Sequence, residues 1–205
     1  FWSTIVLGAI LTGVVGALLV LLARANDNYD RSLGWQTQSM EVISQTRSVD
    51  AAIARAEAAL GRFAVGLQKS DGRVYEYQWA RARQFMAQLQ RNVRDNPKQM
   101  ELVKQLTREM DTRGAQLGDA ALSANYNQTV AAISKYYAAG QGQGLSQIDK
   151  LLTAIIANER TLLRERNRIA IADRASLNQA ILLFSLLGAG AAVIAIGTTF
   201  SLIRA

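Results

Sequence analysis

Three ionisable residues stand seven positions apart near the end of the chain: Glu159, Arg166 and Asp173. A seven-residue interval returns to the same face of an α-helix after two turns, and the other residues on this face are mostly apolar. An ion that faces a helix interface is costly unless it is paired, and it fixes helix register more than it adds stability. We therefore regard these residues as candidates for signal relay through a polar layer with two packings. The alternative is that they form satisfied structural pairs beside a membrane.

Side chains suited to catalysis are scarce. The 205 residues include no histidine and no cysteine, which removes disulfides, thiolate nucleophiles, imidazole bases and the usual zinc, haem or copper ligands. The glycine-rich segment 140–144 has neither the Lys-Ser/Thr nor the preceding strand that a phosphate-binding loop needs. No pair of carboxylates, and no nucleophile with a base, is recognisable. We predict no catalytic residue, no cofactor and no metal ion in this chain.

Aromatic residues gather where the first turn of the central region is expected. Phe63, Tyr75 and Trp79 lie on either side of that turn. Together they could line a distal pocket for a small amphiphile. Aromatic residues at helical spacing also commonly form the core of a bundle, and the sequence leaves both interpretations open.

Two apolar runs without ionisable side chains bracket the chain, at residues 1–23 and 175–203. Each run exceeds the about 20 residues that a helix needs to cross a hydrocarbon core of about 30 Å. Backbone in lipid must satisfy its own hydrogen bonds, which favours helices here. We predict transmembrane helices at 1–24 and 175–204, with one domain, residues 25–174, on a single side of the membrane.

The predicted domain is basic. Residues 24–174 contain 22 Lys and Arg against 16 Asp and Glu, a net charge of +6, and only Arg204 lies outside this stretch. A basic domain outside a membrane can face lipid headgroups or an anionic ligand. The basic residues are scattered among acids rather than gathered in one run, so we expect no nucleic acid partner.

Between the apolar runs, apolar and small residues recur at alternating intervals of three and four, which predicts amphipathic helices. The set of residues that recurs along one predicted helix is here called a seam. The first two seams consist of Trp35, Ser39, Val42, Thr46, Val49, Ile53, Ala56, Leu60, Phe63 and Leu67, and of Tyr75, Trp79, Ala82, Met86, Leu89 and Val93. The last two consist of Val103, Leu106, Met110, Arg113, Leu117, Ala120 and Ala124, and of Leu145, Ile148, Leu152, Ile155, Glu159, Leu162, Arg166, Ile169 and Asp173.

Turn-forming residues separate the seams at 69–72, at Asn96-Pro97 and at 140–144, and a short amphipathic piece is expected at 128–138. Four amphipathic helices with short connections predict an all-α fold, an up-down-up-down four-helix bundle. No glycine-proline linker separates the bundle from the apolar runs. We therefore expect the first and last bundle helices to be continuous with the two transmembrane helices.

Three segments resemble the third class of CHASE domains, extracellular sensory modules of histidine kinases and nucleotide cyclases. Residues 95–99, Asp-Asn-Pro-Lys-Gln, are similar to the Asn-Pro-x-Gln break between the second and third helices of that family. Residues 158–166 are similar to its Glu-x-x-Leu-Leu-x-x-Arg stretch, and the glycine-rich loop before Leu145 stands at a similar break. Glu57 and then residues 61–66 stand where members show a Glu followed by Arg-Gly-Tyr-Leu-Leu-Thr-Gly. The resemblance implies a periplasmic bundle with a cytoplasmic kinase, cyclase or phosphodiesterase module beyond Ala205.

We predict a sensor in the bacterial inner membrane, with a periplasmic central domain and both ends in the cytoplasm. It would relay a periplasmic signal to a histidine kinase or nucleotide cyclase by helix shift or rotation. The expected partners are membrane lipid, a second copy of the chain in a homodimer, and a periplasmic ligand or partner protein. A chemoreceptor input bundle and a membrane-anchored docking subunit remain alternatives. Because the sequence begins with Phe1 rather than Met, we expect a piece of a longer protein.

Overall fold

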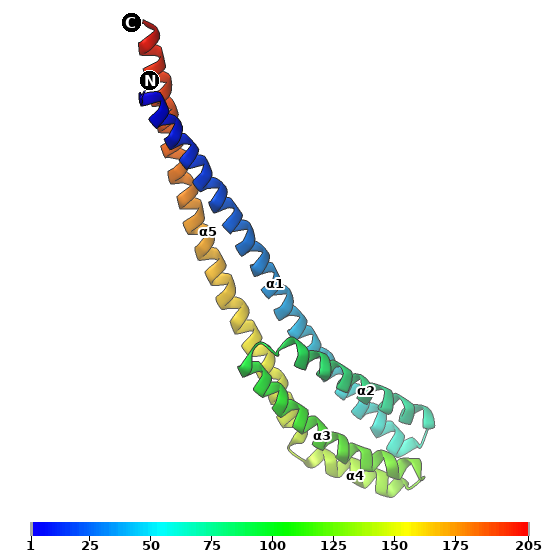
Figure 1. Cartoon of the computed structure of the whole chain (residues 1–205). Coiled ribbons are helices and arrows are strands. Elements are labelled where there is room, and N and C mark those ends of the chain that lie inside the picture. Colours follow the sequence, from blue (N-terminus) through cyan, green and yellow to red (C-terminus); the bar gives the residue numbers. More distant parts are fainter. Residues whose placement is uncertain (1, 205) are drawn as a thin grey trace. The chain divides into compact units, whose positions relative to one another are not determined.

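The structure, a computed structural model, is built from helices. It describes the backbone of residues 2–204, and the side chains of these residues except 2–7, 10, 11, 32, 195 and 198–204. The helices are α1 (Trp2–Gly66), α2 (Lys69–Asn92), α3 (Pro97–Asn125), α4 (Thr129–Gln141) and α5 (Gly144–Arg204) (Figure 1). The described residues include no strand, which confirms the predicted all-α class.

The chain divides into two compact units. One consists of Phe1–Gln36 and Leu163–Ala205, and the other of Thr37–Leu162. Helices α1 and α5 contribute residues to both units, whereas α2, α3 and α4 belong wholly to the second. The domain boundaries predicted at 24/25 and 174/175 remain a prediction.

Local sequence explains where the short connections fall. At the start of α3, the Asn96 side chain accepts a hydrogen bond from the Gln99 backbone N–H at 3.2 Å, and Pro97 occupies the first helical turn. Both features satisfy or remove backbone N–H groups that lack partners at a helix start. Leu67 and Asn127 adopt positive φ angles of 51° and 60°, which end α1 and separate α3 from α4.

Within the unit Thr37–Leu162, the contacts between helices are compatible with the predicted up-down-up-down order. Gln38 near the start of this part of α1 donates to the Asn92 carbonyl at the end of α2, so these helices are antiparallel. Glu57 on α1 contacts Arg113 on α3. Helices α3 and α4 lie side by side (Figure 1). Helix α4 corresponds to the short piece expected at 128–138, and Gly142 and Gln143 separate it from α5.

The core of this unit follows the predicted seams over their central parts. All residues of the second and third seams are buried, as are those from Ser39 to Phe63 in the first and from Ile148 to Glu159 in the fourth. The ends differ: Trp35, Leu145 and Ile169 are 45%, 43% and 49% exposed. Trp35 and Ile169 belong to the unit that contains only α1 and α5, and two helices cover only part of each other's surface.

One helix among the described residues is long and apolar enough to cross a membrane by length and composition. It covers Gly144–Ile194, and its most apolar 18-residue window has a mean hydropathy of 1.9 with none of the window buried. The span predicted at 175–204 remains a prediction. The span predicted at 1–24 includes Phe1 and several side chains outside the described residues, and it remains a prediction.

Candidate functional site

Glu159 lies inside the bundle rather than on its surface, with only 5% of the residue exposed. Its two carboxylate oxygens accept hydrogen bonds from different helices. Ser39 Oγ on α1 donates to Oε1 at 2.8 Å, and Gln99 Nε2 on α3 donates to Oε2 at 2.7 Å. Glu159 itself is on α5, so these three side chains, here called the polar layer, join α1, α3 and α5.

The polar layer contains no cation and leaves one acceptor without a donor. Among the residues that the structure describes, no Lys or Arg forms an ion pair with Glu159. Gln99 is fully buried, and its Nε2 also donates to the Ile155 carbonyl at 3.3 Å, but its Oε1 has no hydrogen-bond partner. A buried acceptor without a donor costs about 1–3 kcal/mol. The layer is therefore held together by hydrogen bonds, but one of its polar atoms, Gln99 Oε1, has no partner.

The other two residues of the seven-residue series lie in the other unit. Arg166 is half-buried, and its guanidinium carbon lies 5.5 Å from the ring centroid of Trp35. Asp173 is exposed. The structure thus buries only Glu159 of the three, and the relay role predicted for them remains a prediction.

Phe63, Tyr75 and Trp79 are all buried in the hydrophobic core. The Tyr75 and Trp79 rings are tilted by 30° with centroids 6.4 Å apart. Burial raises the pKa of Tyr75, and the nearby Arg83 opposes this rise. Trp79 Nε1 is buried without a hydrogen-bond partner. The three residues therefore contribute to packing, while the distal pocket predicted from them remains a prediction.

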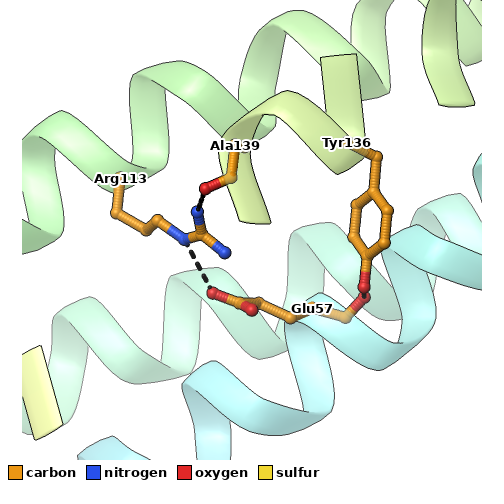
Figure 2. A network of polar contacts seen from close by, with 4 residues as sticks. All are labelled: Glu57, Arg113, Tyr136 and Ala139. Carbon is orange, nitrogen blue, oxygen red and sulfur yellow. Dashed lines mark hydrogen bonds and ion pairs between the residues drawn. The ribbon is translucent and has the colours of Figure 1, made fainter. Parts of the chain in front are cut away.

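A second buried polar network lies on α1, α3 and α4 and was not predicted from the sequence (Figure 2). The Arg113 side chain, 2% exposed, donates from Nε to Glu57 Oε1 at 2.9 Å. Its Nη1 donates to the Ala139 carbonyl in the last turn of α4. Carbonyls in the last turn of a helix lack partners within the helix, and a cation there is favoured by the helix dipole. Arg113 therefore attaches the end of α4 to the bundle.

Tyr136 completes this network. Its hydroxyl donates to the Glu57 carbonyl at 3.3 Å, as Figure 2 shows. A Cβ added at Gly61 would lie 3.0 Å from that hydroxyl, so the absence of a side chain there makes room for Tyr136. Burial raises the pKa of Tyr136, and the Glu57 carboxylate adds to the rise. Glu57 thus uses both its side chain and its backbone to hold α3 and α4.

One sequence signal for this network was present. Arg113 occupies a seam position among Met110 and Leu117, where a charged side chain needs a buried partner. Glu57 stands beside its seam rather than in it, and a partner 56 residues away cannot be read from periodicity. Glu57 is nevertheless the acid that the family resemblance placed before residues 61–66.

Of the comparisons with known proteins, the one with protein families found a match. The family model described as the CHASE3 domain matches residues 32–168, which include the polar layer and the Arg113 network. No curated protein and no solved structure shows detectable similarity to the chain. CHASE3 domains are extracellular sensory domains of signalling proteins. With two thirds of its length matched, this chain belongs to the CHASE3 domain family.

Proposed function

We propose that this chain is the input part of a transmembrane receptor, and that the polar layer around Glu159 relays the signal. The bundle would lie in the periplasm of a bacterium, between spans at 1–24 and 175–204 in the inner membrane. The family supports the sensory role, and the apolar window within Gly144–Ile194 supports the second span.

The observation that carries the proposal is the position of Glu159. The carboxylate is bound by α1 and α3 and belongs to α5, and α1 and α5 are the two helices that contain the predicted spans. A change in the packing of this layer shifts or rotates α1 against α5. Such movement is the input that a cytoplasmic histidine kinase or nucleotide cyclase would receive.

The chemistry of the layer favours two packings of similar free energy. Ser39 and Gln99 donate to different oxygens of one carboxylate, so their hydrogen bonds can exchange between these oxygens. Gln99 Oε1 accepts no hydrogen bond, so a change of packing breaks none at that atom. A ligand or partner protein biases such an equilibrium only by its difference in affinity for the two states. The stimulus therefore has to bind one packing more tightly than the other.

We also propose that the receptor is a homodimer. Gly8, Thr12 and Gly16 repeat every four residues in the predicted first span, and small residues let membrane helices approach closely. Because the chain has no cysteine, Gly16→Cys introduces a single thiol. Oxidation in native membranes should produce a disulfide-linked dimer. Val15 is the preceding residue and points about 100° away around the helix, so Val15→Cys should cross-link less. Equal cross-linking at both positions would argue against this interface.

The relay is tested with Glu159→Leu in the intact receptor, expressed in its native host with a reporter for the output. Leucine removes the carboxylate that Ser39 and Gln99 bind, so one packing should be locked and the output should become independent of stimulus. Glu101→Leu is the matched control, because Glu101 is an exposed glutamate on α3. It should leave the response unchanged.

Thermal unfolding of the purified variants, followed by circular dichroism, shows whether Glu159→Leu remains folded at the assay temperature. A folded Glu159→Leu receptor with a normal response would contradict the relay. The sequence of the gene beyond Ala205 tests the output module separately. A kinase or cyclase module supports the proposal, whereas a long heptad array would favour a chemoreceptor.

A further inference from the structure

A cavity of about 370 Å³ that opens to solvent lies between α1 and α2, and none of its lining residues belongs to the polar layer or to the Arg113 network. Its volume is within the range of small-molecule sites, about 300–1,000 Å³. The lining includes three arginines, Arg47, Arg55 and Arg81, and no acidic residue. The cavity is therefore a concentration of positive charge in the domain.

Among the described residues, the ion pairs involve other arginines, and none of the three lining arginines takes part in one. A cavity lined by one sign of charge raises the local concentration of ions of the opposite sign. Guanidinium groups bind carboxylate and phosphate oxygens through pairs of parallel hydrogen bonds.

Arg81 is held in position before any ligand binds. Its guanidinium carbon lies 5.0 Å from the Phe85 ring centroid and 5.9 Å from that of Tyr77, four residues away on either side along α2. Such cation–π contacts restrict a long side chain. The loss of side-chain entropy on binding is smaller for an arginine that is already ordered.

Apolar side chains share the lining with the arginines. Ile43 is 7% exposed and Phe85 is partly buried, while Met40 is 62% exposed and adaptable in shape. A wall of this kind contributes affinity by removing the apolar surface of a ligand from water. A simple inorganic anion would leave this wall uncovered.

We infer that the cavity between α1 and α2 binds a small organic anion, a carboxylate or phosphate that carries an apolar group. The arginines bind the charged head, and Ile43, Phe85 and Met40 cover the apolar group. A second copy of this chain docked here around a two-fold axis would bring equivalent arginines together, which like charges oppose. This inference goes beyond the proposed relay, because binding can be measured without any output.

The test uses the full chain in nanodiscs of neutral phosphatidylcholine and isothermal titration calorimetry with phenyl phosphate. The site variant is Arg47→Gln/Arg81→Gln. The matched control is Arg83→Gln/Arg91→Gln, which removes the same charge from exposed positions outside the cavity. Loss of the two charge-assisted contacts should weaken binding about tenfold or more in the site variant and leave the control at the wild-type affinity.

Further titrations separate the contribution of the charged head of the ligand from that of its apolar group. Inorganic phosphate and phenol should each bind at least about tenfold more weakly than phenyl phosphate, because each lacks one half of the ligand. Ser44→Phe, which fills the cavity from an exposed position without a change in charge, should also weaken binding. Competition by phosphatidylglycerol in the nanodisc would identify a lipid headgroup as the source of the anion, and its absence a soluble compound.

Equal affinity in the wild-type chain and in Arg47→Gln/Arg81→Gln would overturn the inference. So would equal weakening in the two double variants, since it would mean that overall charge alone attracts the anion. Inorganic phosphate that binds as tightly as phenyl phosphate would exclude a role for the apolar wall. Circular dichroism confirms that each variant is folded before its titration.

Discussion

Arg113 Nε donates to Glu57 Oε1 at 2.9 Å, and the arginine side chain is only 2% exposed. The pair joins α3 to α1 across 56 positions of sequence. Apolar seam residues can slide by a heptad and still find apolar partners, whereas this pair satisfies its charges in one register only. The ion pair therefore specifies how α3 lies against α1.

Arg113→Met should destabilise the bundle by about 3–5 kcal/mol, because it leaves the Glu57 carboxylate, whose side chain is only 13% exposed, without its cation. It also removes the donor to the Ala139 carbonyl at the end of α4. Chemical unfolding of the purified chain, followed by circular dichroism, measures the change. Arg108→Met is the control, because Arg108 and Glu101 form an exposed pair at 3.8 Å that should contribute less than about 1 kcal/mol. Similar losses in both variants would contradict the structural role of the buried pair.

Two glycines of α3 should respond in opposite directions to alanine. A Cβ at Gly114 would lie 2.9 Å from the Trp79 ring, whereas a Cβ at Gly118 would meet nothing within 4 Å. Gly114→Ala should therefore destabilise by about 1–3 kcal/mol through overpacking. Gly118→Ala should stabilise by up to about 1 kcal/mol, since alanine is the better helix former. The same unfolding measurement checks both, and stabilisation by Gly114→Ala would mean that Trp79 does not pack against this glycine.

The stability of the bundle should fall at alkaline pH, partly because of Tyr75. Burial raises the pKa of Tyr75 in the folded chain above its ordinary value of 10.0. The stability that depends on this group is fully present below pH 10.0 and is lost as the pH rises through the folded-state pKa. Tyr75→Phe keeps the ring and removes the ionisable hydroxyl, so it should reduce the loss of stability between about pH 9 and pH 12.

The control for this experiment is Tyr126→Phe, because Tyr126 is 70% exposed. Thermal unfolding across the same pH range should show no change in the alkaline loss for this variant. An unchanged alkaline loss in Tyr75→Phe would show that other groups account for it.

Much of the fold could be predicted because it depends on the intervals at which apolar residues recur along each helix. Val49, Leu89 and Leu106 are fully or almost fully buried, as the intervals of three and four between seam residues predict. Trp35 keeps the same interval and yet is 45% exposed. Periodicity identifies the face of a helix that seeks a partner, but it does not say how many helices are present at that level to cover it.

The candidate sites were predictable only in part, for a related reason. Glu159 was identified because a charge in an apolar seam is conspicuous, but its partners Ser39 and Gln99 are 120 and 60 residues away in the chain. The cavity arginines lie on the exposed sides of α1 and α2, where charged residues are ordinary. Their convergence is a property of how two helices pack, and no spacing within either helix encodes it.

Helices α1 and α5 are each assigned as one uninterrupted helix, over Trp2–Gly66 and Gly144–Arg204. One residue inserted into such a helix turns every later side chain by about 100°, whereas seven inserted residues nearly restore the original phase. Engineered hybrids that join this input domain to a foreign output therefore have to be designed by phase. Junctions that differ by whole heptads should retain coupling. Junctions offset by one or two residues should turn a different face of the helix toward the output domain and lose coupling.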